Sequence, residues 1–215
     1  MKPAVAIVLM SSVLLGAQAT DDSWLTWSGS RAQGIGKAAY VQGRVGGIFD
    51  TRFLKTERSY NYKLAATWMT ADVIRATART LQLTERFSDD QARALVAEAD
   101  KAGATVVMVE IDPREGSGVI PNDWAAFLQA QTPAGEEPRA VRGQDTPKLR
   151  EVRALAGVLR RNYDYDRFWV VFPLTHSDGK PLFVAGDMTA ELVVRIADRE
   201  GRVRWPIPSS IKNRP

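Results

Sequence analysis

The chain has 215 residues, 45% of them hydrophobic and 25% charged, a balance that excludes collagen-like and intrinsically disordered proteins. It contains no cysteine, which excludes disulfides, thiolate zinc sites and a cysteine nucleophile. The formal charge of +4 is mild and spread along the sequence, so it does not indicate a nucleic-acid partner.

Residues 1–19 have the three parts of a secretory signal peptide: a basic start, an apolar run at 4–15 and an A-x-A pattern at 17–19. The pattern predicts cleavage between Ala19 and Thr20. The apolar run is shorter than the roughly 20 residues that a membrane-spanning helix needs. No later segment is apolar enough for a span, so we expect an exported protein, periplasmic or extracellular, without a transmembrane segment in the mature chain.

Residues 20–37 are polar and contain several glycines, so we expect a flexible N-terminal arm ahead of a single domain over 38–215. Trp24 and Trp27 stand alone in this arm and are candidate contacts for a partner. Residues 38–50 combine strand-type side chains with three glycines, which predicts a bent strand.

The next segments have clear periodicity. Residues 58–69 alternate between an apolar and a mostly polar face, which predicts a strand. Helices are expected at 70–83 and 88–102, the second of them starting with a capping box from Ser88. The β-branched run at 105–111 predicts a buried strand.

The second half of the chain mixes helical and strand signals. We expect a short helix at 122–129, an exposed linker rich in proline and glycine near 132–147, and a third helix at 149–159. Two hairpins should complete the domain, with strands at 167–174, 180–185, 189–197 and 202–207.

Strands thus flank a helical middle, without the regular alternation of a doubly wound sheet. The sequence predicts an α+β fold. An antiparallel sheet or sandwich forms from the N- and C-terminal strands, with two or three helices packed at one side.

Three carboxylates lie at the end of the buried strand at 105–111 or just after it, namely Glu110, Asp112 and Glu115. Glu110 and Asp112 are two residues apart, so their side chains can share one face of the strand. Such a pair can act as general acid and base in glycoside cleavage. The pair can also bind calcium, although no ligand spacing of the EF-hand type supports this, and it can equally be solvated charge at a strand end.

Other catalytic signatures fail. The only histidine, His176, lies beside a predicted hairpin turn, and an exposed turn residue is its simplest interpretation. The stretch 34–37 lacks the spacing of a phosphate-binding loop, and no cofactor motif occurs. Three of the six tryptophans fall at strand positions and should pack in the core: Trp68, Trp169 and Trp205.

Two functional hypotheses follow. The first is a non-catalytic exported module that holds a protein or a polymer of the bacterial envelope on a β-rich surface. The alternative is a small exported hydrolase of polysaccharide or cell-wall material, with Glu110, Asp112 or Glu115 as its catalysts. Export also argues against a nucleic-acid partner, because an exported protein meets no chromosomal DNA.

Overall fold

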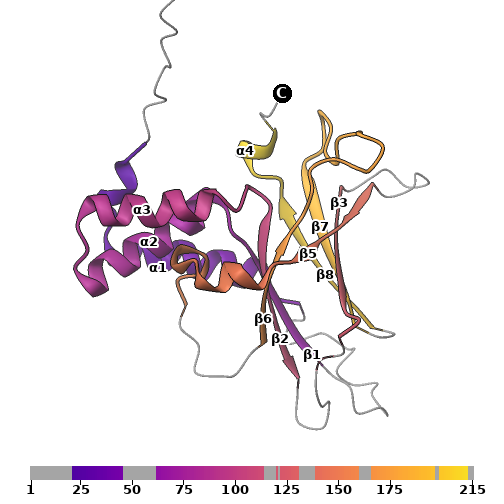
Figure 1. The fold of residues 1–215 in the computed structure, drawn as a ribbon, viewed down its shortest axis with the longest axis horizontal. Coiled ribbons are helices and arrows are strands. Elements are labelled where there is room, and N and C mark those ends of the chain that lie inside the picture. The colour runs from indigo at the N-terminus through magenta and orange to yellow at the C-terminus, as the bar shows by residue number, and fades with distance from the viewer. Residues whose placement is uncertain are drawn as a thin grey trace, which may run out of the picture.

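A computed structural model describes residues 21–45, 62–113, 120, 122–130, 139–159, 166–196 and 199–212. It confirms the α+β fold: two antiparallel sheets of four strands each, with helices to one side (Figure 1). The predicted signal peptide lies outside the described residues and stays a prediction. The helices and strands are α1 Gly29–Gln42, β1 Tyr62–Trp68, α2 Ala71–Glu85, α3 Asp89–Asp100, β2 Val106–Pro113, β3 Ala125–Ala130, β4 Ala140–Arg142, β5 Gln144–Asp145, β6 Asp166–Val171, β7 Thr189–Ile196, β8 Arg199–Pro206 and α4 Ser209–Lys212.

The elements form three layers (Figure 1). The helical layer, α1 to α3, covers the middle sheet, whose strand order is β1-β2-β6-β5. The other face of the middle sheet packs on the outer sheet, of order β4-β3-β7-β8. One hydrophobic cluster is formed by residues of both sheets, and a second fills the space beneath the helices.

The middle sheet is buried on both faces. The predicted apolar face of β1 is confirmed, because Leu64, Ala66 and Trp68 belong to the cluster between the sheets. The opposite face is less exposed than its polar sequence indicates, since Thr67 is only 4% exposed. The helical layer covers it.

The helices α2 and α3 form where the sequence predicts them. The Thr70 side chain accepts from the backbone N–H of Val73 and begins α2. At the start of α3, Ser88 and Gln91 form the expected capping box. Among the described helices, none has the length and hydropathy to cross a membrane.

The expected N-terminal arm and the first part of the bent strand expected at 38–50 are wrong, because residues 29–42 form helix α1. Residues 46–50 lie outside the described residues. Ser28 caps this helix by accepting from the backbone N–H of Arg31. Two small residues of α1 that lie one turn apart, Ala32 and Gly36, form its buried face. These small residues let α1 pack closely on its neighbours but give a weak amphipathic signal, which explains the wrong prediction.

Strand β3 replaces the short helix expected at 122–129. Its burial alternates residue by residue, so Ala126, Leu128 and Ala130 face the core between the sheets. The predicted linker at 132–147 is also wrong in its described part, where β4 and β5 form. Gly143 lies between these two strands and carries the chain from the outer to the middle sheet.

The third helix expected at 149–159 is instead a pair of 3₁₀ turns, Pro147–Glu151 and Arg153–Leu155. The apolar residues Leu149, Val152 and Leu155 are spaced by three, which is the 3₁₀ period.

In the first C-terminal hairpin, 180–185 forms no strand. A single bridge joins Thr175 to Pro181 around the predicted turn. The second hairpin is confirmed, since β7 pairs with β8 and Leu192 lies opposite Val203 in the core.

Candidate functional site

Glu110 is buried inside the molecule. It lies on β2 and is 2% exposed. Its Oε1 is 3.3 Å from Nε of Arg167 on the neighbouring strand β6. The side chain borders a cavity of about 20 Å³ beneath α1, which is too small for a sugar ring. Glu110 is therefore placed as an interior ion-paired group.

The structure does not bring the three predicted carboxylates together as a site. Asp112 occupies the position of β2 opposite Lys63, and nothing is described of its side chain. Glu115 lies outside the described residues. Within the described ranges, no group of three or more histidine, aspartate or glutamate side chains is arranged to hold a metal ion.

Trp24 and Trp27 are not exposed, contrary to expectation. They are 3% and 8% exposed and belong to the cluster beneath the helical layer. The 3₁₀ turn Ser23–Thr26 places the two rings three residues apart on one side of the chain. The tryptophans predicted to lie in the core, Trp68, Trp169 and Trp205, are confirmed there.

His176 lies at the predicted turn, where its backbone N–H donates to the Lys180 carbonyl at 2.8 Å. The residue is half-buried and not fully exposed as expected. Its Nε2 is enclosed and has no hydrogen-bond partner in the described part of the chain. No hydrogen bond joins its side chain to a hydroxyl in the described segments, and it is the chain's one histidine, so it forms no recognisable catalytic group.

A different surface, the outward face of the outer sheet, collects charged and aromatic side chains. Strand pairing aligns Arg142, Phe127, Val193 and Arg202 in one row across β4, β3, β7 and β8. Neighbouring strands lie about 4.8 Å apart, so the row is roughly 14 Å long. Two apolar residues thus lie between two arginines in the row; Phe127 is half-buried and Val193 is 2% exposed.

The adjoining row contains a buried carboxylate, Glu191, which is 5% exposed. Gln129 Nε2 and Arg202 Nη1 donate to its Oε2 at 2.6 and 2.7 Å, and Arg204 Nε donates to its Oε1 at 2.7 Å. Burial opposes ionisation of Glu191, but these three hydrogen bonds outweigh it and hold its pKa below the ordinary value. The carboxylate is therefore fixed as an anion that orients two arginines.

Phe127 and its neighbours form a hollow on this face. The hollow has a volume of about 460 Å³. The Arg195 guanidinium lies over the Phe127 ring, 5.1 Å from its centroid. The lining combines apolar, amide and guanidinium groups: Phe127, Gln129, Ala140, Arg142, Val193 and Arg195.

The face is basic overall. Its four arginines, at 142, 195, 202 and 204, are opposed by Glu191 and Glu200, which leaves a net charge of +2. Glu200 pairs with both Arg195 and Arg202. Arg142 is exposed and makes no ion pair with any residue in the described segments. This guanidinium is available to an external anion.

Part of this surface was visible in the sequence. Arg202 and Arg204 alternate with the inward Val203 and Trp205, which is the pattern of a basic outward face. Arg142 gave no such signal, because its strand β4 lies in the segment predicted to be a linker.

Comparison with protein-family models, curated proteins and solved structures finds no match for this chain. The arrangement of its own residues is therefore the basis for any functional conclusion.

Proposed function

We propose that this chain is an exported, non-catalytic binding module that holds an acidic polysaccharide of the bacterial envelope on the outward face of the β4-β3-β7-β8 sheet. The observation that carries the proposal is the row from Arg142 through Phe127 and Val193 to Arg202. It combines separated cations with the half-buried Phe127 ring on a sheet.

An acidic polysaccharide matches this chemistry better than other anions. Guanidinium groups bind carboxylates through paired hydrogen bonds, and the ring carbons of a sugar can lie against the half-buried Phe127. The carboxamide of Gln129 borders the same hollow and can bond to hydroxyls. A repeating polymer also matches a row of roughly 14 Å better than a single small anion does.

The alternative remains an exported carboxylate hydrolase. The position of Glu110 weighs against that alternative, because an ion-paired group in a cavity of about 20 Å³ cannot reach a polysaccharide. Replacing Glu110, Asp112 and Glu115 with alanine tests the carboxylate set directly. Loss of glycan cleavage in a folded triple variant would favour the hydrolase.

The binding test titrates the purified protein with polygalacturonate and, as a neutral comparison, dextran. We expect polygalacturonate to bind and dextran to fail, with affinity decreasing as salt is added. Arg142→Glu should weaken binding about tenfold or more, because it replaces an attraction with a repulsion. Arg86→Glu, at the exposed end of α2, is the matched charge reversal and should bind like the wild type.

Three results would overturn the assignment. Equal binding of dextran would show that the ligand need not be charged. Unchanged binding by Arg142→Glu would show that the ligand does not bind at the outward face of the outer sheet. Binding only to polyphosphate or to anionic lipid vesicles would replace the polysaccharide with another ligand.

Export is tested separately, by the intact mass of the protein isolated from its native cells. The proposal requires an N-terminus at Thr20 in an extracytoplasmic fraction. A chain that keeps Met1 in the cytosol contradicts it.

A further inference from the structure

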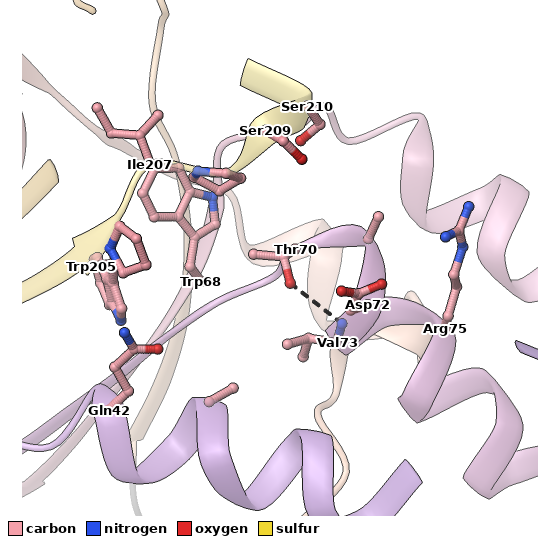
Figure 2. Close-up of a pocket in the computed structure, with 14 residues that line it drawn as sticks. Gln42, Trp68, Thr70, Asp72, Val73, Arg75, Trp205, Ile207, Ser209 and Ser210 are labelled. Carbon is pink, nitrogen blue, oxygen red and sulfur yellow. Dashed lines mark hydrogen bonds between the residues drawn. The ribbon is translucent and has the colours of Figure 1, made fainter. Parts of the chain in front are cut away.

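A pocket of about 420 Å³ lies where the end of the outer sheet meets the helical layer, and its volume is typical of small-molecule sites. It is lined by the end of α1, the start of α2 and the segment that leads from β8 into α4. Figure 2 shows Gln42 and Trp205 on one side of it, and Asp72 and Arg75 on the other.

The indole N–H of Trp205 is a hydrogen-bond donor in the lining of the pocket. The Trp205 side chain is 4% exposed, and its Nε1 makes no hydrogen bond with another residue in the described segments. The atom is not enclosed, because among the described side chains the buried polar atom without a partner is His176 Nε2. A donor that reaches solvent can exchange its water for an acceptor on a ligand. Trp68, in the same lining, already donates to the Ala104 carbonyl at 3.1 Å. The Trp205 donor is therefore open to an acceptor that enters the pocket.

The remaining polar groups offer both donors and acceptors. Gln42 contributes a carboxamide, Asp72 a carboxylate and Arg75 a guanidinium. Figure 2 shows the hydroxyl-bearing Ser209 and Ser210 above them. The segment that leads from β8 into α4 adds apolar lining from Pro206, Ile207 and Pro208.

We propose that this pocket binds one or two units of a neutral saccharide. Each sugar hydroxyl both donates and accepts, which suits a lining that mixes carboxylate, guanidinium, carboxamide and hydroxyl groups. A charged ligand is disfavoured, because the pocket presents one carboxylate and one guanidinium and an ion of either sign meets a like charge. Trp205 Nε1 and the Asp72 carboxylate hold two different hydroxyls of the sugar.

This inference does not depend on the proposed function. The pocket shares no residue with the hollow around Phe127, and it takes a neutral ligand instead of an acidic one. The Arg142→Glu variant should therefore bind the neutral sugar as the wild type does, even where it no longer binds polygalacturonate.

The test follows the tryptophan indole resonances of ¹⁵N-labelled protein during titration with glucose, galactose, mannose and N-acetylglucosamine. At least one sugar should shift the Trp205 indole resonance until it saturates and leave that of Trp24 unchanged. Trp205→Phe identifies the resonance by its disappearance. If that variant does not fold, through-space contacts to Ile207 identify it in the wild type.

Two pocket variants complete the test without disturbing the core. Gln42→Ala and Asp72→Asn should each weaken binding of the sugar about tenfold, the usual cost of one lost hydrogen bond to a ligand. Asp90→Asn, in the first turn of α3, is the matched control and should bind normally. The proposal is overturned if none of the four sugars gives a saturable shift, if both variants bind like the wild type, or if glucuronate binds as tightly as glucose.

Discussion

Glu191 Oε1 accepts a hydrogen bond from Arg204 Nε at 2.7 Å across the β7–β8 pair, although the glutamate is buried and the arginine is exposed. Together with Gln129 and Arg202, this arginine keeps the carboxylate ionised below its ordinary pKa of 4.5. A buried anion thereby orients the cations of the face that we assign to ligand binding.

The lowered pKa of Glu191 gives a prediction for pH. The unfolded chain binds the Glu191 proton more tightly than the folded chain, so the ionised group stabilises the fold above pH 4.5. That contribution is lost as the pH falls through the lowered pKa. Urea unfolding should show that Glu191→Gln is less stable at neutral pH and loses less stability on acidification.

Glu98→Gln provides the control, because Glu98 is exposed on α3 and makes no ion pair with a residue in the described ranges. If the free energy of unfolding of Glu191→Gln changes with pH as that of the wild type does, then Glu191 does not contribute to the acid dependence of stability.

Alanine substitution should change the stability of the fold in opposite directions at Gly34, within α1, and at Gly43, directly after it. A Cβ at Gly43, which ends α1, would lie 1.6 Å from the Ala66 carbonyl oxygen, so Gly43→Ala should cost about 2–3 kcal/mol in free energy of unfolding. A Cβ at Gly34 meets nothing within 4 Å, so Gly34→Ala should stabilise the helix by about 0.5–1 kcal/mol. Thermal unfolding measures both, and destabilisation by Gly34→Ala would contradict the placement of α1.

Trp27 anchors the chain just before α1, with its ring in the cluster beneath the helical layer. Trp27→Ala should lower the free energy of unfolding by about 3–4 kcal/mol, because it leaves a cavity there. Lys37→Ala, on the exposed side of α1, should change it by less than about 0.5 kcal/mol. Equal stabilities of the two variants would indicate that this segment is an unpacked arm after all.

Glu110 should stabilise the fold. Glu110→Ala leaves Arg167 without a carboxylate that lies 3.3 Å away, and we expect a loss of about 1–3 kcal/mol in urea unfolding. Binding of polygalacturonate by the folded variant should be unchanged, because Glu110 borders the helical layer and not the outward face of the outer sheet. A variant that is as stable as the wild type but differs from it in glycan cleavage would instead favour the hydrolase hypothesis.

Local signals in the sequence predicted the elements that depend on neighbouring residues. The capping box of Ser88 and Gln91 fixes the start of α3, and the alternation around Val203 and Trp205 fixes the inward face of β8. These features act within one turn or one strand, so no distant part of the chain is needed to recognise them.

The errors concern elements that tertiary contacts decide. Helix α1 is stabilised by close packing at small residues such as Gly36, which lower its intrinsic helix propensity. Strand β4 has three residues and depends on pairing with β3. The row from Arg142 to Arg202 joins strands far apart in sequence, so the candidate surface could be recognised only after the sheet was assembled.

The most direct test of the binding surface follows the backbone amide resonances of ¹⁵N-labelled protein during titration with polygalacturonate. We predict saturable shifts concentrated at Phe127, Arg142 and Arg195, with little change in α2 and α3. Shifts confined to the helical layer, or none at a concentration that saturates binding, would contradict the assignment of the outer sheet as the ligand-binding surface.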